Sequence, residues 1–171
     1  DKISAESALP FVSKIAAHGH NSVLEMAVVT LDVACDDEKL VSLLKLQPKY
    51  LIIDANEKGG MITGSIRAFR ELYLRSKENE LVLALVSFLA GKHAYLCECV
   101  YDPETAALVP ADIAVKKIPL EEVEKLPATL LMRHRYVGVK FIVNRAVTHE
   151  LVRHRPCSYL QESQRYCRYS Q

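Results

Sequence analysis

The sequence contains no apolar run that approaches the roughly 20 residues needed for a membrane-spanning helix. It also contains no internal repeat and no low-complexity segment, so repeat architectures are not expected. Of its 171 residues, 50% are hydrophobic and 25% are charged. This composition suffices for one globular domain with a hydrophobic core, or for a domain that carries an insertion. We expect a protein that does not associate with membranes.

Cysteines are few and form no recognisable framework. The five are odd in number and scattered along the chain, which argues against a set of structural disulfides. Cys97 and Cys99 are separated by one residue, a spacing that structural zinc sites do not usually have. No secretory signal peptide is visible. We therefore expect free thiols and a cytoplasmic location.

The net charge of +1 hides an uneven distribution along the chain. Residues 133–171 carry a charge of +6, because eight Lys and Arg residues outnumber two acids, whereas residues 1–132 carry −5. Seven of the eight basic residues are Arg, which favours planar, bidentate recognition of phosphate. The C-terminal segment is therefore predicted to bind an anionic ligand.

Periodicity and turn residues predict an α+β protein. The expected helices cover residues 4–17, 36–46, 65–76, 78–90, 120–126 and 145–154. The expected strands cover residues 27–34, 50–54, 61–63, 95–101 and 137–143. Residues 102–118 contain two prolines and are expected to form a loop.

The predicted helix at residues 145–154 has two different faces. Ala146, Glu150 and Arg153 follow the i, i+4, i+7 spacing and share a polar face. The apolar stripe consists of Val143, Val147 and Leu151. Because a proline disfavours helical geometry in the residue before it, Pro156 predicts an exit into a loop.

That loop is rich in Arg, Ser, Gln and Glu, and it can surround a small polar anion. Arginines would bind phosphate oxygens, while amide and carboxylate groups would read the donors and acceptors of a base or ring. The structural alternative is a solvated helix end whose arginines pair with acids. Two acids are too few to neutralise the segment, which weakens that alternative.

The same segment contains a signature. Arg153-His154-Arg155 is followed by seven residues, 156–162, and then by Ser163. This pattern resembles the signature of the flavin-dependent thymidylate synthases, and the continuation Gln164-Arg165-Tyr166 also fits that family. Another Arg-His-Arg triplet, at residues 133–135, does not match, because Val143 stands where the serine is required.

An earlier block, His18 to Glu25, resembles the flavin-side motif of the same family. The resemblance implies an α+β fold with a mixed or antiparallel sheet and flanking helices. About 100 residues separate the two blocks. We therefore predict a discontinuous, motif-bearing α/β core formed by residues 1–35 and 136–171, and an inserted α+β segment at residues 36–135.

The resemblance also implies a reaction. Family members methylate deoxyuridine monophosphate at C5 to form thymidine monophosphate. The carbon comes from methylenetetrahydrofolate, and the hydride comes from FAD that NADPH has reduced. The family is a homotetramer with sites shared between subunits, so a self-associating chain is expected. No nucleic-acid or membrane partner is expected, and no metal.

Site residues follow from the motif positions. Arg153 and Ser163 are the residues that the resemblance places in the catalytic centre. Those expected near FAD are His20, Ser22, Arg153, His154, Arg155, Pro156 and Gln161. Those expected to line the nucleotide site are Glu150, Arg153, Gln161, Glu162, Ser163, Gln164 and Arg165.

Two features depart from the family pattern. Leu160 and Met26 stand where the family often has Asn and His, and Leu160 removes a polar group from the signature loop. Family members usually continue well past the signature, which raises the alternative that the 171 residues are a fragment. The alternative function is a flavin- or nucleotide-binding module without turnover.

Several residues also admit other chemistries. His18 and His20 are candidate metal ligands, although no third ligand is evident nearby. Cys157 beside Arg155 is a candidate thiolate nucleophile, and Ser163 a candidate hydroxyl nucleophile. Another reading is RNA binding, with bases stacked on aromatic rings among the arginines. The rings concerned are Tyr159, Tyr166 and Tyr169.

Overall fold

The computed structural model describes residues 4–97, 99–154 and 157–161 of the chain. The chain divides into two compact units, Asp1–Tyr136 and Val137–Gln171, which we call the first and the second unit. Each unit is described by itself below. Within the described residues, no helix is both long and apolar enough to cross a membrane.

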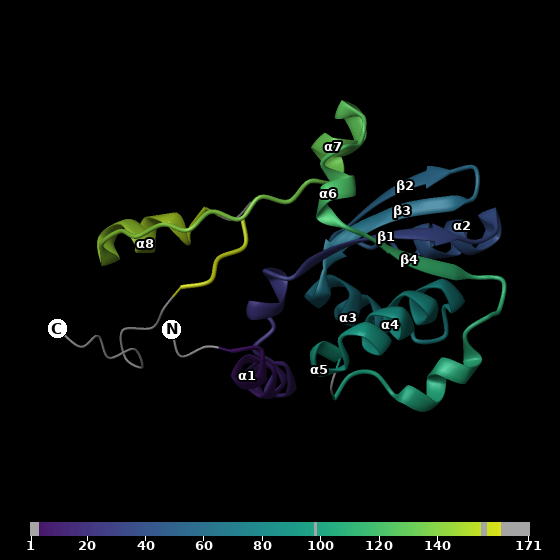
Figure 1. Cartoon of the computed structure of the whole chain (residues 1–171), viewed down its shortest axis with the longest axis horizontal. Coiled ribbons are helices and arrows are strands. Elements are labelled where there is room, and N and C mark those ends of the chain that lie inside the picture. The colour runs from purple at the N-terminus through teal and green to yellow at the C-terminus, as the bar shows by residue number, and fades with distance from the viewer. Residues whose placement is uncertain (1–3, 98, 155–156, 162–171) are drawn as a thin grey trace. The chain divides into compact units, whose positions relative to one another are not determined.

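A four-stranded antiparallel sheet organises the first unit (Figure 1). Its order is β2-β3-β1-β4, so the strand that comes first in the chain lies inside the sheet. The strands are β1 (Val28–Ala34), β2 (Leu51–Asn56), β3 (Gly59–Ser65) and β4 (Ala114–Ile118). With helices beside this sheet, the predicted α+β class with an antiparallel sheet is confirmed.

The hairpin between β2 and β3 shows how local sequence directs the sheet. Asn56 pairs with Gly59, and the Asn56 side chain accepts a hydrogen bond from the Lys58 amide at 2.9 Å. Gly59 has φ +138°, and a Cβ atom there would lie 2.3 Å from the Val33 carbonyl oxygen. Only glycine fits this turn and the close approach of β1.

The core lies on one face of the sheet. Leu31 and Val33 of β1 and Ile62 of β3 point into it, as the two-residue period of a strand requires. Most of the helical part of the core comes from α2 (Asp37–Lys45), α3 (Ile66–Arg75) and α4 (Glu80–Lys92). Figure 1 shows α3 and α4 beneath the sheet. The side chains of Asp36, Ser65 and Asn79 cap these helices.

The remaining elements are short, apart from the first helix. Ser4 caps α1, and Gly19, with φ +75°, follows the end of that helix. The elements are α1 (Ala5–Ala17), η1 (Val23–Glu25), α5 (Ala94–Cys97), η2 (Pro103–Leu108), α6 (Leu120–Val123), α7 (Ala128–His134) and α8 (Arg145–Leu151). Two predicted helices are shorter than expected, since α6 ends at Val123 and α8 at Leu151.

Two predictions in the middle of the chain are wrong. The described residues of the range 95–101 form no strand; α5 covers Ala94–Cys97 and packs against α1 and α4, with the Cys97 side chain in the core. Residues 102–118 are not simply a loop, because η2 and the edge strand β4 lie within them. Lys116-Lys117 interrupts the alternation by which a strand is recognised, yet lysine suits an exposed edge.

The predicted strand at residues 137–143 is also absent from the structure, which describes this stretch as irregular. Strand geometry needs a hydrogen-bonded neighbour, and no described segment pairs with this one. Its side chains are left open to solvent, with Ile142 89% and Phe141 59% exposed. The division into a core of residues 1–35 and 136–171 and an inserted segment stays a prediction.

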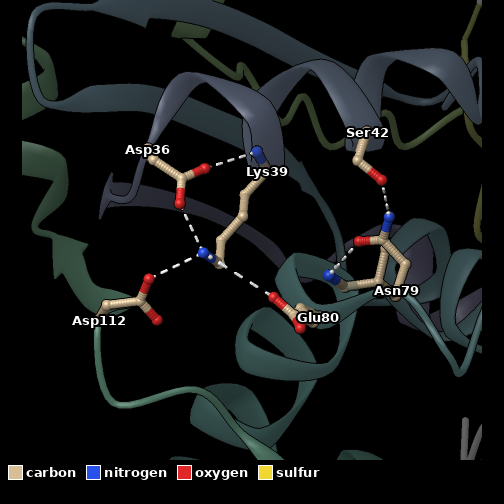
Figure 2. Close-up of polar contacts among 7 residues, drawn as sticks. Asp36, Lys39, Ser42, Asn79, Glu80 and Asp112 are labelled. Carbon is tan, nitrogen blue, oxygen red and sulfur yellow. Dashed lines mark hydrogen bonds and ion pairs between the residues drawn. The ribbon is translucent and has the colours of Figure 1, made fainter.

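Lys39 joins three parts of the first unit through a cluster of carboxylates (Figure 2). Its Nζ lies 2.5 Å from Asp36 at the start of α2, 2.8 Å from Asp112 before β4, and 3.9 Å from Glu80 of α4. Hydrogen bonds from Lys39 lower the pKa of both Asp36 and Asp112. The same contacts, with Asp112 first, raise the pKa of Lys39.

We predict that this cluster makes the stability of the folded protein depend on pH in the acidic range. The two aspartates have folded-state pKa values below their unfolded values, so their contribution is complete above about pH 4. It is lost as the pH falls through the lower, folded-state pKa. Lys39→Met should lower the midpoint of thermal unfolding at pH 7 and flatten its dependence on pH below about 4. Lys45→Met, on the same helix, is the control; equal behaviour of both variants would contradict the prediction.

Candidate functional site

The signature begins at the end of α8 in the second unit. Asn144 caps this helix by accepting a hydrogen bond from the Val147 amide at 3.1 Å. The last helical residue is Leu151, so Arg153 and His154 follow the final turn. Both side chains are exposed. The helix therefore presents the start of the signature to solvent.

Arg153 is held only at the surface. Its Nη1 lies 2.8 Å from Glu150 Oε1, and the two side chains are 70% and 73% exposed. Such an exposed ion pair contributes about 0–1 kcal/mol. An anionic ligand can therefore replace Glu150 as the partner of Arg153 at little cost. The structure thus brings together two of the predicted nucleotide-site residues.

The signature loop returns to α8 at Gln161. Its Nε2 donates to Thr148 Oγ1 at 3.1 Å, and Thr148 Oγ1 donates to the Arg145 carbonyl oxygen at 2.9 Å. Arg145 Nε in turn donates to His149 Nε2 at 3.4 Å. Arg145, Thr148 and His149 thus form a second polar face of α8, which the sequence analysis missed. An i, i+3, i+4 grouping of polar residues on α8 was the signal for it.

The remaining signature positions were also predicted as site residues. Arg155, Pro156, Glu162, Ser163, Gln164 and Arg165 lie outside the described residues. Cys157 and Leu160 are described and exposed, and Cys157 is a free thiol. Desolvation raises the pKa of the neighbouring Tyr159. The proposals that Cys157 or Ser163 acts as a nucleophile, or that the tyrosines stack on RNA, stay predictions.

The earlier block, His18 to Glu25, lies in the first unit and runs from the end of α1 through η1. Leu24 is buried in the core, and Glu25 Oε1 lies 2.7 Å from Arg67 Nη1 of α3. A hydrogen bond to Glu71, and then the Glu25 charge, raise the pKa of Arg67. His20 and Ser22 remain exposed. Their side chains are therefore accessible, whereas Leu24 and Glu25 anchor the block.

His18 is engaged in the local structure of α1. Its Nδ1 lies 2.7 Å from the Lys14 carbonyl oxygen, a hydrogen bond that ties the ring to the last turn of the helix. Within the described part of the chain, no three His, Cys, Asp or Glu side chains are arranged to hold a metal ion. The structure therefore offers no ligand set to which His18 and His20 would belong within those residues.

The first Arg-His-Arg triplet, residues 133–135, is used inside the first unit. Arg133 Nη1 lies 2.7 Å from Asp54 Oδ1, and Arg135 Nε lies 3.0 Å from Glu124 Oε1. The His134 side chain is fully buried, with Nε2 2.7 Å from Asp54 Oδ2. All three residues of this triplet have partners in their own unit. The signature triplet differs at its histidine, because His154 is exposed whereas His134 is buried.

His134 belongs to a buried chain of hydrogen bonds that resembles a hydrolase triad. Its Nδ1 lies 2.7 Å from Thr63 Oγ1, which is 2.8 Å from Thr30 Oγ1. In a Ser-His-Asp triad, however, Nε2 faces the nucleophile and Nδ1 faces the carboxylate. Here the two nitrogens are reversed, and Thr63 is 0% exposed. This chain therefore attaches α7 to β2, β3 and β1 rather than presenting a nucleophile to a substrate.

Comparison with protein families agrees with the signature. Residues 120–171 match the family model described as thymidylate synthase complementing protein. The resemblance to the flavin-dependent thymidylate synthases is therefore confirmed for this C-terminal part of the chain, and the activity to which the family points is thymidylate synthesis in general. The His18–Glu25 block lies outside the match. Searches of curated proteins and of solved structures found no significant match.

The two triplets allow a matched test of whether the central histidine of each contributes to folding stability. His134→Ala should lower the free energy of unfolding by about 2–4 kcal/mol, because Asp54 and Thr63 lose buried hydrogen-bond partners. His154→Ala should change it by less than about 0.5 kcal/mol, because the His154 side chain is exposed. Urea unfolding of both variants measures the difference. Comparable losses in the two would show that the triplets do not differ in this way.

Proposed function

We propose that this chain takes part in FAD-dependent methylation of deoxyuridine monophosphate to thymidine monophosphate. In this proposal methylenetetrahydrofolate supplies the carbon and NADPH the reducing equivalents. The observation that carries it is the exposed Arg153 at the start of a signature that matches the family. We further propose a cytoplasmic location, which the four free cysteines among the described residues support.

The described side chains suit the ligands that the family implies. Arg153 offers a planar guanidinium for a phosphate, and Glu150 offers carboxylate oxygens to an N–H donor such as that of uracil. Gln161 offers both a donor and an acceptor. We propose that His20, Ser22, His154, Arg155 and Pro156 contribute to the FAD site. Glu162, Ser163, Gln164 and Arg165 would complete the nucleotide site.

Each component has a separate task in the proposed reaction. When bound, the flavin would supply the redox chemistry, while the protein supplies position and electrostatics. Arg153 would hold the nucleotide by its phosphate, so that the base meets the cofactor in one orientation. Ser163 and Arg165 would bind the phosphate or base beside it. A flavin- or nucleotide-binding module without turnover would use the same residues.

We also propose that the chain assembles with copies of itself, as a homotetramer with shared sites. Among the described residues of the second unit, none is buried. Apolar side chains at Val137, Val139, Phe141 and Ile142 are between 59% and 89% exposed. Exposed apolar surface of this kind marks an interaction site. A second copy of the chain is the partner that the family implies.

Arg153→Ala tests the proposed nucleotide site. The purified protein should bind FAD and show flavin absorbance, and deoxyuridine monophosphate should alter its rate of NADPH oxidation. Arg153→Ala should weaken nucleotide binding at least about 10-fold, because a charge-assisted hydrogen bond is lost. Isothermal titration calorimetry measures the affinity.

Arg133→Ala is the matched control for this variant. It should lower stability, since Arg133 pairs with Asp54, but leave nucleotide affinity within about twofold. A protein that takes up no FAD at high concentration would overturn the proposed function. If FAD binds but the rate of NADPH oxidation does not change when the nucleotide is added, the module without turnover is favoured. Unchanged affinity in Arg153→Ala would show that the nucleotide lies elsewhere.

Self-association is tested by the molar mass in solution. Size-exclusion chromatography with light scattering should give a multiple of 19.2 kDa, with four copies expected. Ile142→Asp should shift the mass to smaller species, because it places a charge in the proposed interface. Leu108→Asp is the control, since Leu108 is 69% exposed but lies in the first unit. A monomeric parent protein would contradict this proposal.

A further inference from the structure

Thr148 forms a hydrogen bond with Gln161 of the signature loop, and the family resemblance assigns Gln161 to ligand binding. It lies within α8, 13 residues before Gln161, and its hydroxyl oxygen accepts the hydrogen bond from Gln161 Nε2 at 3.1 Å. Thr148 is half-buried, whereas its neighbours His149 and Glu150 are exposed. No motif position assigned Thr148 a role. The contact is therefore a link between helix and loop that the sequence pattern does not record.

Counting protons determines which way the Gln161 amide is turned. The Thr148 hydroxyl has one proton, and it donates this proton to the Arg145 carbonyl oxygen at 2.9 Å. Threonines within helices commonly make this bond. Toward Gln161, the Thr148 oxygen can then act only as an acceptor. The amide must present Nε2 to Thr148, so its Oε1 points elsewhere and remains available.

This Oε1 has no hydrogen-bond partner among the described residues, and it is an acceptor with a defined position. An imide N–H, which lies between two carbonyl groups, is a donor that such an oxygen can recognise. Both ligands of the proposed function contain this group, since uracil and the isoalloxazine ring each have one imide N–H. A freely rotating glutamine would present N–H groups or oxygen equally well. A glutamine fixed by Thr148 presents oxygen.

We propose that Thr148 is a positioning residue that turns Gln161 so that Oε1 accepts a hydrogen bond from the imide N–H of the bound nucleotide or flavin. This inference rests on the proposed function, because it names the group that Gln161 reads. Thr148 itself touches no ligand in this scheme. It acts through Gln161, by removing one of the two orientations of the amide.

Four variants test this role: Thr148→Val, Thr148→Ser, Gln161→Met and the double variant Thr148→Val with Gln161→Met. Valine keeps the shape of threonine without the hydroxyl, and it should weaken binding of the imide ligand about 3- to 10-fold. Serine keeps the hydroxyl and should retain affinity within about twofold. The double variant should bind no more weakly than Gln161→Met alone, since Thr148 acts only through Gln161.

Separate titrations distinguish the two sources of the imide. FAD binding is followed by flavin fluorescence, and binding of deoxyuridine monophosphate by calorimetry. The ligand whose affinity falls in Thr148→Val is the one whose imide Gln161 reads. If Thr148→Val weakens binding equally in the presence and absence of Gln161, Thr148 does not act through Gln161 and the proposal is overturned. Loss of affinity in Thr148→Ser as large as in Thr148→Val would also overturn it.

One measurement separates this inference from the proposed function. In NMR spectra of the ligand-free protein, the Gln161 side-chain amide protons should show cross-relaxation with the Thr148 methyl group. The chemical shifts of these amide protons should change in Thr148→Val but not in Thr148→Ser. If the protein binds neither FAD nor the nucleotide, the proposed function fails, and the imide role fails with it. If both bind but these amide protons show no contact with Thr148, the positioning role alone is overturned.

Discussion

The burial of His134 between Asp54 and Thr63 is the constraint that holds the end of the first unit together. A ring with no exposed surface must satisfy both nitrogens, because each unpaired polar atom would cost about 1–3 kcal/mol. Asp54 accepts from Nε2, and the hydroxyl pair Thr63–Thr30 completes the other side. The network therefore attaches α7 to three neighbouring strands.

That attachment explains why two copies of one tripeptide have different roles. Arg133-His134-Arg135 ends a short helix beside the sheet, where Asp54 and Glu124 are within reach. Arg153 and His154 follow the end of α8, whose only nearby acid, in the described residues, is the exposed Glu150. The difference lies in long-range contacts to β2 and in Glu124, the acid that directly follows α6. Spacing to Ser163 separates the two triplets in the sequence, and burial of the central histidine separates them in the structure.

Most of the first unit could be predicted from local sequence. Capping residues such as Asp36 and Ser65, the glycines of the β2–β3 turn and the alternation in β1 are short-range signals. The failures occur where a distant partner decides. Residues 95–101 are rich in aromatic and sulfur side chains that fit a strand, but contacts with α1 and α4 favour a helical turn there. The edge strand β4 exists because β1 has a free side, which its own five residues do not reveal.

The candidate site was predictable only in part, for the same reason. The signature spacing identified Glu150, Arg153 and Gln161, because those positions follow a fixed pattern. Thr148 could not be found in that way. Within a helix a threonine is neutral or slightly unfavourable, and its value here comes from a loop residue 13 positions later. A hydrogen bond between a helix and a returning loop depends on the path of the loop, which periodicity does not describe.

The second unit raises a further physical question, because its described residues build no core. A segment of this length rarely buries enough apolar surface to offset the entropy of ordering its chain. The residues from Val137 to Ile142 nevertheless have the composition of a strand, and Arg145–Leu151 is already a capped helix. Local signals therefore specify the helix, whereas a strand at residues 137–142 would need a hydrogen-bonded pairing partner. If copies of the chain cover these exposed apolar side chains, as proposed above, assembly and ligand binding become coupled equilibria.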